Sequence, residues 1–316
     1  MIKNLVFSGC GVKIFLYVGI LKYLAEHNLL DKVERLVGCS AGALILFFVA
    51  LDYSYSEIYE LLLGIKLEDI TKMDSDSVLN FFGNFGMCSL EEAERILRII
   101  LKAKVGSESI TFRDLFNKTN KDLIVVATNI HKYKTVFFSK DQTPDMDVVT
   151  AVKMSICIPI FFNPVKYDDE YYVDGGLTCH YPIEYIDPSE YKITLGVLVL
   201  PDYCIFEDCL DNSTSTQDVG NIKQCAKIDT IEEYIFSILG CPVFKQIQQS
   251  FKNHNNITLL IINNKNPVDF SLSQSEKLTF VDSGYDKITE FYPSYKEYIE
   301  IQETKKEYST KSTQTD

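Results

Sequence analysis

The sequence lacks the features that would place it in several common classes of protein. No apolar run is long enough to span a bilayer, since the longest covers only residues 41–51. Acidic residues outnumber basic ones, and the net charge of −13 argues against nucleic acid and against simple electrostatic attraction to anionic lipid. The start of the chain lacks the length and cleavage site of a secretory signal peptide. We therefore expect a protein that works in the cytoplasm or at the surface of a membrane.

Signals for disulfides, metals and nucleotide cofactors are also missing. The nine cysteines include no Cys-x-x-Cys pair, so they fit a reducing compartment better than a disulfide framework. Zinc is not expected, because the cysteines between residues 204 and 241 follow no known ligand spacing. The Gly-x-Gly at residues 9–11 lacks both a third glycine and an acidic partner for a ribose, which argues against a dinucleotide site. We predict a protein without a cofactor or a metal site.

The composition is typical of a globular protein with a sizeable core. The chain has 316 residues, of which 46% are hydrophobic and 24% are charged. Strands and helices alternate along it, which predicts a three-layer α/β/α fold with a mostly parallel central sheet. We assign residues 1–300 to a single domain, with a polar surface insertion at about 202–226. Residues 301–316 are predicted to form a disordered polar tail.

Apolar patterns and turn signals place the individual elements. Serine-initiated capping boxes at residues 54–57 and 89–92 predict the starts of two helices, and a proline at residue 159 ends another. The predicted strands are 4–8, 35–39, 123–127, 135–139, 161–165, 171–174, 193–200 and 257–262. The predicted helices are 15–30, 41–51, 54–64, 89–104, 148–156, 230–251 and 273–298. A weaker signal for a helix start lies at residue 111.

The most informative segment is Gly-Cys-Ser-Ala-Gly at residues 38–42, between a predicted strand and an apolar helix. A strand, a sharp turn and a helix form the layout of a nucleophile elbow. Gly38 and Gly42 flank Ser40 where Cβ atoms would clash with a strained turn. The hydroxyl would project at a helix N-terminus, where the helix dipole favours developing negative charge. A helix N-cap serine produces the same local pattern, so the interpretation depends on further motifs.

Two further motifs lie at the ends of predicted strands. A Gly-rich loop follows the first strand, and a turn of this kind exposes backbone N–H groups toward one point, which suits an oxyanion or a phosphate. Asp174 ends a later strand and is followed by Gly175 and Gly176, so its carboxylate is held on a tight turn. The loop residues are Gly9, Cys10, Gly11 and Val12.

These motifs, in this order, resemble those of the patatin-like phospholipase family. The family has a Gly-rich loop, a Gly-x-Ser-x-Gly elbow and an Asp-Gly-Gly or Asp-Gly-Ala turn, which match residues 9–11, 38–42 and 174–176. The resemblance covers roughly residues 4–190 and implies a patatin-like fold and a lipid acyl hydrolase of the phospholipase A or lysophospholipase type. It implies that Ser40 attacks an ester of a phospholipid or other acyl lipid at a membrane surface. Asp174 would accept the proton and the loop amides would stabilise the oxyanion.

The Gly-rich loop departs from the family pattern, which usually reads three glycines, a variable residue, arginine and glycine. Cys10 replaces one glycine, Lys13 stands for the arginine, and Ile14 stands for the last glycine. Lys13 keeps the positive charge without the bidentate fork of arginine, and it is a candidate contact for a charged group of the substrate. These departures leave open a non-catalytic lipid-binding or scaffold protein of the same fold.

Two histidines and one loop leave further alternatives. The order Ser40, Asp174, His254 would also permit a triad esterase, although that fold places more strands before its elbow. His180, where the family often has asparagine, is either a third catalytic residue or a histidine of the surface or of a loop. The phenylalanine-rich residues 81–87 form either a lid that touches lipid or a loop packed into the core.

Overall fold

The computed structural model describes residues 1–65, 81, 83–201, 228–229 and 231–312. At its centre, parallel strands follow one another in the order β10-β9-β1-β2-β4. Every residue of β1 and β9 is buried, as expected for parallel strands covered on both faces. The predicted α/β fold with a mostly parallel sheet is confirmed. The parallel strands are β1 Asn4–Phe7, β2 Arg35–Cys39, β4 Asp122–Asn129, β9 Thr194–Leu200 and β10 Thr258–Ile262.

Antiparallel strands extend the sheet beyond β4. Strand β8 pairs with β4 and with β7, and β5 pairs separately with β4. The single strand predicted at residues 161–165 is wrong, because these residues divide between β7 and β6, and β6 pairs with β3 in a separate small sheet. The proline at residue 164 explains the break, since it supplies no N–H to a strand ladder. These elements are β3 Gly86–Cys88, β5 Lys134–Phe138, β6 Ile160–Phe162, β7 Val165–Tyr167 and β8 Glu170–Asp174.

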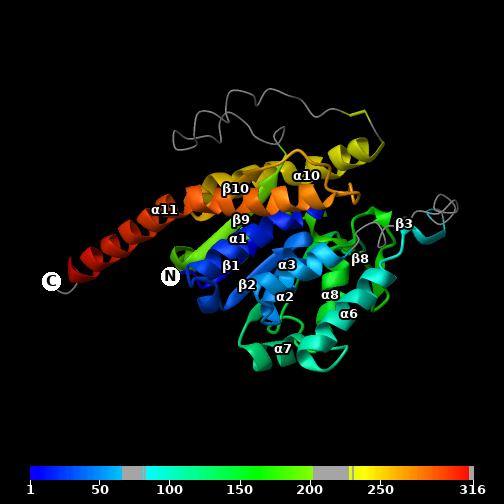
Figure 1. The fold of residues 1–316 in the computed structure, drawn as a ribbon, viewed down its shortest axis with the longest axis horizontal. Helices are drawn as coiled ribbons and strands as arrows, with labels where there is room; N and C mark the ends of the chain where they lie inside the picture. The colour runs from blue at the N-terminus through cyan, green and yellow to red at the C-terminus, as the bar shows by residue number, and fades with distance from the viewer. Residues whose placement is uncertain (66–80, 82, 202–227, 230, 313–316) are drawn as a thin grey trace.

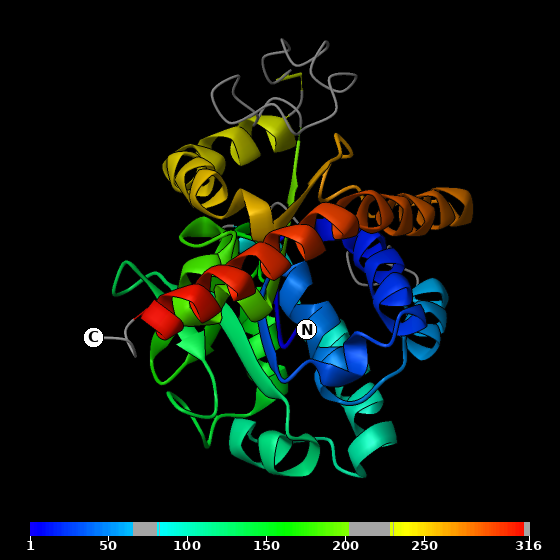
Figure 2. The same cartoon turned by 90° about the vertical axis from the view of Figure 1, so that its left-hand side faces the viewer.

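Helices cover both faces of the sheet (Figures 1 and 2). Helix α2, which follows the elbow, is buried along almost its whole length, so the apolar run at residues 41–51 is a core helix. The helices are α1 Phe15–Glu26, α2 Ala41–Ala50, α3 Tyr55–Gly64, α6 Glu91–Val105, α7 Phe112–Thr119, α8 Val148–Ser155, α10 Ile231–His254 and α11 Gln274–Ser312. Short 3₁₀ turns include η1 Gly11–Ile14, η3 Gly175–Leu177 and η4 Pro182–Tyr185.

Two glycines allow helices α1 and α11 to approach each other closely. A Cβ atom on Gly19 of α1 would lie 1.9 Å from the carbonyl oxygen of Val281 on α11. A Cβ atom on Gly284 of α11 would lie 2.0 Å from the carbonyl oxygen of Leu16 on α1. Both distances are far below van der Waals contact, so any larger side chain would push the helices apart. Helix α11 therefore packs closely against α1, the first helix of the chain.

The structure corrects two expectations about helix ends. Helix α11 continues to Ser312, so a disordered tail from residue 301 is wrong as far as that residue. Adding residues to an existing helix is much less costly than starting one, which explains why a polar segment can extend it. The capping box at Ser54 is confirmed, whereas α6 begins without a side-chain cap and Ser89 accepts only the Glu91 N–H. The predicted insertion at about 202–226 lies outside the described residues. Within those residues, no helix is long and apolar enough to span a membrane.

Candidate active site

Ser40 occupies a strained turn between β2 and α2. Its backbone has φ 53° and ψ −125°, a conformation that residues other than glycine rarely adopt. Its N–H donates to Ser155 Oγ at 2.9 Å, and Ser155 Oγ in turn donates to the Val126 carbonyl. The sequence motifs indicate no role for Ser155, and the structure shows that this serine anchors the backbone of the elbow. The strained backbone of Ser40 is therefore held by its hydrogen bond to Ser155 of α8, which is in turn held by a hydrogen bond to Val126 of β4.

The two glycines of the elbow permit close backbone contacts. A Cβ atom on Gly38 would lie 2.5 Å from the backbone of Ala43, within the elbow itself. A Cβ atom on Gly42 would lie 2.5 Å from the Phe7 carbonyl oxygen at the end of β1. The first turn of α2 thus packs directly against the start of the Gly-rich loop. This contact brings the serine and the loop amides to the same edge of the sheet.

Asp174 lies at the end of β8 and contacts Ser40 directly. Ser40 Oγ donates to Asp174 Oδ2 at 2.5 Å, and the Gly176 N–H donates to Asp174 Oδ1 at 2.7 Å. The backbone of Asp174 is also held, because its N–H donates to the Cys157 carbonyl at 2.8 Å and its carbonyl accepts from Thr128 Oγ1 at 3.0 Å. The structure therefore brings together the two side chains that the sequence motifs single out.

The environment of Asp174 makes it a stronger base than an ordinary aspartate. Burial in the protein raises its pKa from 3.8 to about 7, although hydrogen bonds from Ser40 and Gly176 oppose the shift. A carboxylate with a pKa near neutrality accepts a proton from a hydroxyl group more readily than one with a pKa near 4. Burial thus supplies part of the basicity that a Ser–Asp pair without histidine needs.

Two backbone amides of the Gly-rich loop have no acceptor among the described residues. The Gly9 N–H donates to the His180 carbonyl at 3.1 Å, and the Val12 N–H donates to the Pro267 carbonyl at 2.9 Å. Within the described residues, the amides of Cys10 and Gly11 donate to no protein acceptor. Of the four amides predicted for the oxyanion hole, those of Gly9 and Val12 are therefore already engaged, and those of Cys10 and Gly11 are not engaged by any described residue.

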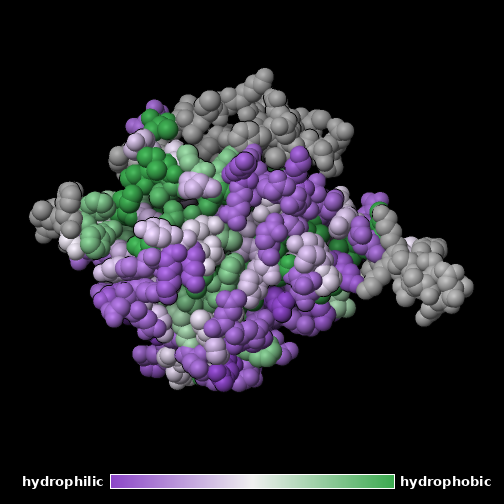
Figure 3. Space-filling view, turned by 180° about the vertical axis from the view of Figure 1, so that it is seen from behind, coloured by the Kyte–Doolittle hydropathy of each residue, from purple (hydrophilic) through white to green (hydrophobic). Residues whose placement is uncertain are grey.

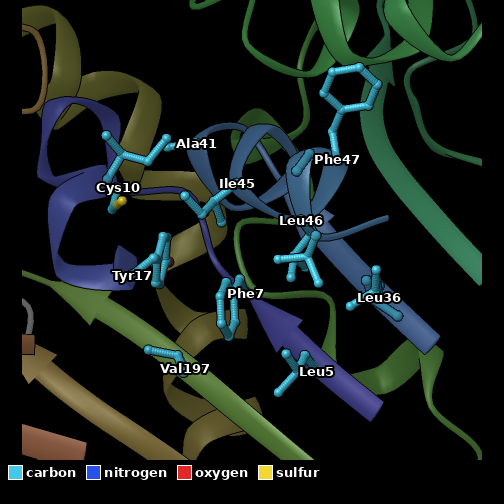
Figure 4. Packing of buried hydrophobic residues seen from close by; sticks show 14 of the residues in the cluster. Leu5, Phe7, Cys10, Tyr17, Leu36, Ala41, Ile45, Leu46, Phe47 and Val197 are labelled. Carbon is cyan, nitrogen blue, oxygen red and sulfur yellow. The ribbon is translucent and has the colours of Figure 1, made fainter. Parts of the chain in front are cut away.

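Apolar packing fixes the loop and the elbow against each other. Phe7 at the end of β1 stacks on Tyr17 of α1, with ring centroids 4.5 Å apart. Figure 4 shows these rings in the same cluster as Cys10 of the loop and Ile45 of α2. The Tyr17 hydroxyl donates to the Ser8 carbonyl at 2.6 Å, directly before the loop. The loop and its amides are therefore supported by a buried cluster of apolar side chains.

The side chain of Lys13 forms a hydrogen bond within the protein. Its side chain is buried, and Nζ donates to the carbonyl oxygen of Asn263 at 3.0 Å, just after β10. The lysine thus connects the Gly-rich loop to the C-terminal part of the chain. Its suggested contact with a charged group of the substrate stays a prediction.

The two candidate histidines have different surroundings. The His180 ring lies between the loop and the Asp174 turn, since a Cβ atom on Gly9 would lie 3.3 Å from both His180 Nδ1 and Ser40 Cβ. Burial lowers the pKa of His180 to about 4, so the ring is neutral. His254 is at the end of α10, where its Nδ1 donates to the Ser250 carbonyl at 2.7 Å and its ring packs on Tyr191. Neither its hydrogen bond nor its ring contact involves the Ser–Asp pair.

The cysteines near Ser40 are not suited to act as nucleophiles. Burial raises the pKa of Cys10 to about 12 and that of Cys39 well above its usual range, so both remain protonated thiols. Among the described residues, no group of three His, Cys, Asp or Glu side chains is placed to hold a metal ion. Cys204, Cys209 and Cys225 lie outside those residues.

An apolar hollow of about 360 Å³ lies beside the Asp174 turn. Val173 and Leu177, on either side of that turn, contribute to its wall, and Phe85 is 61% exposed at its edge. Ile160 has a φ of 76°, which is unfavourable for a β-branched residue and marks a strained wall. Hydrophobic side chains gather on the surface near β3 and the start of α10 (Figure 3). The complete lining is Phe81, Phe85, Ile130, Pro159, Ile160, Phe162, Pro164, Val173 and Leu177.

Comparisons with known proteins find relatives of this chain in viruses and bacteria. Residues 5–187 match the model of a family described as patatin-like phospholipase. An uncharacterized protein of Acanthamoeba polyphaga mimivirus is 29% identical over 294 residues, which cover 91% of this chain and 92% of the viral protein. A probable lipid hydrolase of Invertebrate iridescent virus 6 is 35% identical over 188 residues, which cover 58% of this chain and 62% of that protein.

Solved structures with low sequence identity share the fold. VipD from Legionella pneumophila has a TM-score of 0.60 at 18% identity, over 93% of this chain and 67% of VipD. ExoU of Pseudomonas aeruginosa, in complex with SpcU, has a TM-score of 0.53 at 17% identity, over 93% of this chain and 52% of the matched chain. This chain therefore spans about half of the matched ExoU chain. At such identities the likeness concerns the fold alone.

Proposed function

The chain belongs to the patatin-like phospholipase family, and on this premise we propose that it is a lipid acyl hydrolase that cleaves carboxylic esters of phospholipids. Ser40 would be the nucleophile and Asp174 the base. The observation that carries the proposal is the hydrogen bond from Ser40 Oγ to Asp174 Oδ2, at a strained elbow beside two available amides. A nucleophile in hydrogen-bond contact with a base is the arrangement that covalent catalysis requires.

In the first half of the reaction, Ser40 Oγ attacks the ester carbonyl carbon while its proton passes to Asp174 Oδ2. Negative charge develops on the carbonyl oxygen, where the amides of Cys10 and Gly11 would donate hydrogen bonds. Loss of one such donor typically costs about 10²–10³ in rate, so this loop matters as much as the two side chains. The bond to the leaving alcohol then breaks, the alcohol takes the proton from Asp174, and Ser40 remains acylated.

In the second half, a water molecule replaces the alcohol. Asp174, ionised again, takes one proton from the water as its oxygen attacks the acyl carbonyl. The bond to Ser40 Oγ breaks, the serine recovers its proton from Asp174, and the fatty acid leaves. The same carboxylate thus serves both halves, and its pKa of about 7 suits both roles because it can release the proton as well as accept it.

The hollow beside the site favours a substrate with an acyl chain. Its lining is almost wholly apolar, and burial of each methylene group contributes about 0.8 kcal/mol. Phe81 and Phe85, from the segment predicted to be a lid or a packed loop, contribute to the wall. Lipid binding at this place agrees with the name of the viral relative, a probable lipid hydrolase. Whether the segment moves stays a prediction.

Fatty-acid release from mixed phospholipid vesicles tests the proposal. We expect Ser40→Ala and Asp174→Asn each to lower the rate by about 10³-fold or more, while Ser250→Ala, a buried serine on α10, leaves it unchanged. A fluorophosphonate probe should label the parent and not Ser40→Ala. If both site variants release fatty acid like the parent, the Ser–Asp assignment is wrong. If the parent neither releases fatty acid nor reacts with the probe, a non-catalytic lipid-binding protein of this fold becomes the better explanation.

A further inference from the structure

His180 lies where the three parts of the site meet. Its carbonyl accepts the Gly9 N–H at 3.1 Å, so the residue is joined to the Gly-rich loop through the backbone. A Cβ atom on Gly9 would lie 3.2 Å from His180 Cε1 and 3.3 Å from Ser40 Cβ. A Cβ atom on Gly176 would lie 3.0 Å from Asp174 Oδ1 and 3.5 Å from His180 Nδ1. The imidazole ring therefore lies close to both the proposed nucleophile and the proposed base.

The hydrogen bond of the ring fixes which nitrogen carries the proton. His180 Nε2 lies 3.5 Å from the carbonyl oxygen of Val199, and a carbonyl oxygen can only accept a hydrogen bond. Nε2 is consequently the protonated nitrogen, and Nδ1 presents a lone pair. The half-buried ring is neutral at ordinary pH because burial lowers its pKa, and the nearby charge of Lys13 lowers it further. Nδ1 is thus an acceptor toward the side of the ring where the two glycines lie.

We propose that His180 Nδ1 orients the water molecule that hydrolyses the acyl-enzyme, by accepting a hydrogen bond from one of its O–H groups. The other O–H group would point to Asp174. His180 Nδ1 lies 3.3 Å from the Cβ position of Gly9, which is also 3.3 Å from Ser40 Cβ, and 3.5 Å from the Cβ position of Gly176, which is 3.0 Å from Asp174 Oδ1. A water molecule has the two O–H groups that the two acceptors, His180 Nδ1 and the Asp174 carboxylate, require.

The step balances without a change in the charge of His180. The water oxygen forms a bond to the acyl carbonyl carbon, and the bond from that carbon to Ser40 Oγ breaks. One water proton passes to Asp174 and then to Ser40 Oγ, while the other remains on the fatty acid until it ionises in solution. His180 restricts the orientation of the water and takes no proton. Correct placement of a reactant for attack contributes substantially to rate, and a misplacement of about 1 Å can cost about 100-fold.

This inference rests on the proposed function, since it requires an acyl-Ser40 intermediate. The experiment follows single turnovers of a chromogenic acyl ester, with release of the alcohol reporting acylation and mass spectrometry of quenched samples reporting decay of acyl-Ser40. For His180→Ala we expect acylation within about threefold of the parent and decay slowed by about 10- to 100-fold. His180→Asn, whose side-chain oxygen is also an acceptor, should recover part of the decay rate. His254→Ala, the matched control, should behave like the parent in both steps.

The possible results distinguish the proposed role of His180 from the proposed Ser–Asp function. Slow decay with normal acylation supports the role of His180, and accumulation of acyl-Ser40 is a signature that a merely structural role would not give. Equal slowing of both steps, or no slowing of either, overturns that role and leaves the Ser–Asp proposal standing. If the parent itself forms no acyl-Ser40, the proposed function fails first. If His180→Ala does not fold, the same comparison is made with His180→Asn and His180→Leu, of which only the asparagine variant keeps an acceptor.

Discussion

Residues 5–187 and the C-terminal part of the described chain contribute to the candidate site in different ways. The region matched by the family model contains the Gly-rich loop, the elbow and the Asp174 turn. The later region contributes backbone carbonyl groups: Val199 accepts from His180, Asn263 from Lys13, and Pro267 from Val12. The proposed reactive groups therefore belong to the first region, while part of their positioning depends on the second. A chain ending near residue 187 would carry every motif of the proposed site and lack these supports.

Gly11 of the first region packs closely against Pro267 of the second. Gly11 has a φ of 57°, and a Cβ atom there would lie 2.1 Å from the Pro267 carbonyl oxygen. For Gly11→Ala we expect kcat/KM to fall by about 10²–10³-fold, because the loop must shift and an oxyanion donor is displaced. Fatty-acid release from vesicles measures the loss.

Gly106→Ala provides the matched control for this substitution. Gly106 also has a positive φ, 81°, but open space surrounds its Cβ position. It should lose about 1–2 kcal/mol of stability from backbone strain and keep its kcat/KM. Equal activity in Gly11→Ala and Gly106→Ala would mean that the Pro267 carbonyl group does not position the Gly-rich loop.

The pH dependence of kcat/KM tests the region that carries the reactive groups. Asp174 must be ionised to accept a proton, and burial raises its pKa to about 7, so activity should fall about tenfold per unit below pH 7. An ordinary aspartate would keep full activity down to about pH 5. His180 cannot cause a fall near pH 7, because its pKa is about 4. A plateau that extends to pH 5 would contradict the raised pKa of the carboxyl group.

The contribution of Asp174 to stability should fall with rising pH, whereas kcat/KM should rise. The folded state holds the Asp174 proton more tightly than the unfolded state, so this group reduces the free energy of unfolding as the pH rises from about 4 to about 7. His180 acts in the other direction, because its pKa is lowered on folding and burial disfavours its charged form. The quantity to compare is therefore the free energy of unfolding of Asp174→Asn minus that of the parent. This difference should increase with pH up to about pH 7 and then stay constant.

The sequence motifs predicted the region of reactive groups better than the region that supports it. The parallel strands and the turns at Ser40 and Asp174 could be predicted because their signals are local: apolar runs followed by glycine turns. The engagement of Gly9 and Val12 could not, since their partners are backbone carbonyl groups of residues 180 and 267, and a carbonyl group leaves no trace in the sequence. The raised pKa of Asp174 depends on burial, which follows from the assembled fold.

Two errors in the predicted elements have the same origin. The strand expected at 161–165 is interrupted at Pro164, and the part before it, β6, pairs with β3, a strand far earlier in the chain that local patterns do not reveal. The polar residues after 301 were expected to be disordered because they bury little, yet they continue a helix whose earlier turns pack on α1. In both cases a contact distant in the sequence decided the local structure.

The packing of α11 on α1 gives a test of the C-terminal region that does not involve the site. Gly284→Ala places a Cβ atom 2.0 Å from the Leu16 carbonyl oxygen, so we expect the free energy of unfolding to fall by about 1–3 kcal/mol. Denaturant titration measures this loss, and kcat of the folded enzyme should not change. Gly240→Ala, within α10 and with open space around its Cβ position, should be neutral or slightly stabilising. A drop in kcat for Gly284→Ala would show that this helix pair also positions the site.

Lys13 gives the smallest expected effect and the finest test of the connection between the regions. Its buried Nζ donates to the Asn263 carbonyl at 3.0 Å, a hydrogen bond from a charged group. Lys13→Met removes that donor while keeping most of the apolar stem, so we expect kcat/KM on an uncharged short-chain ester to fall about tenfold. Lys13→Arg keeps the charge and should lose less. Because this substrate has no phosphate, a loss here reflects positioning of the loop. If Lys13→Met impairs only phospholipid substrates, the lysine contacts the substrate charge, and the Gly-rich loop keeps its position without the connection to Asn263.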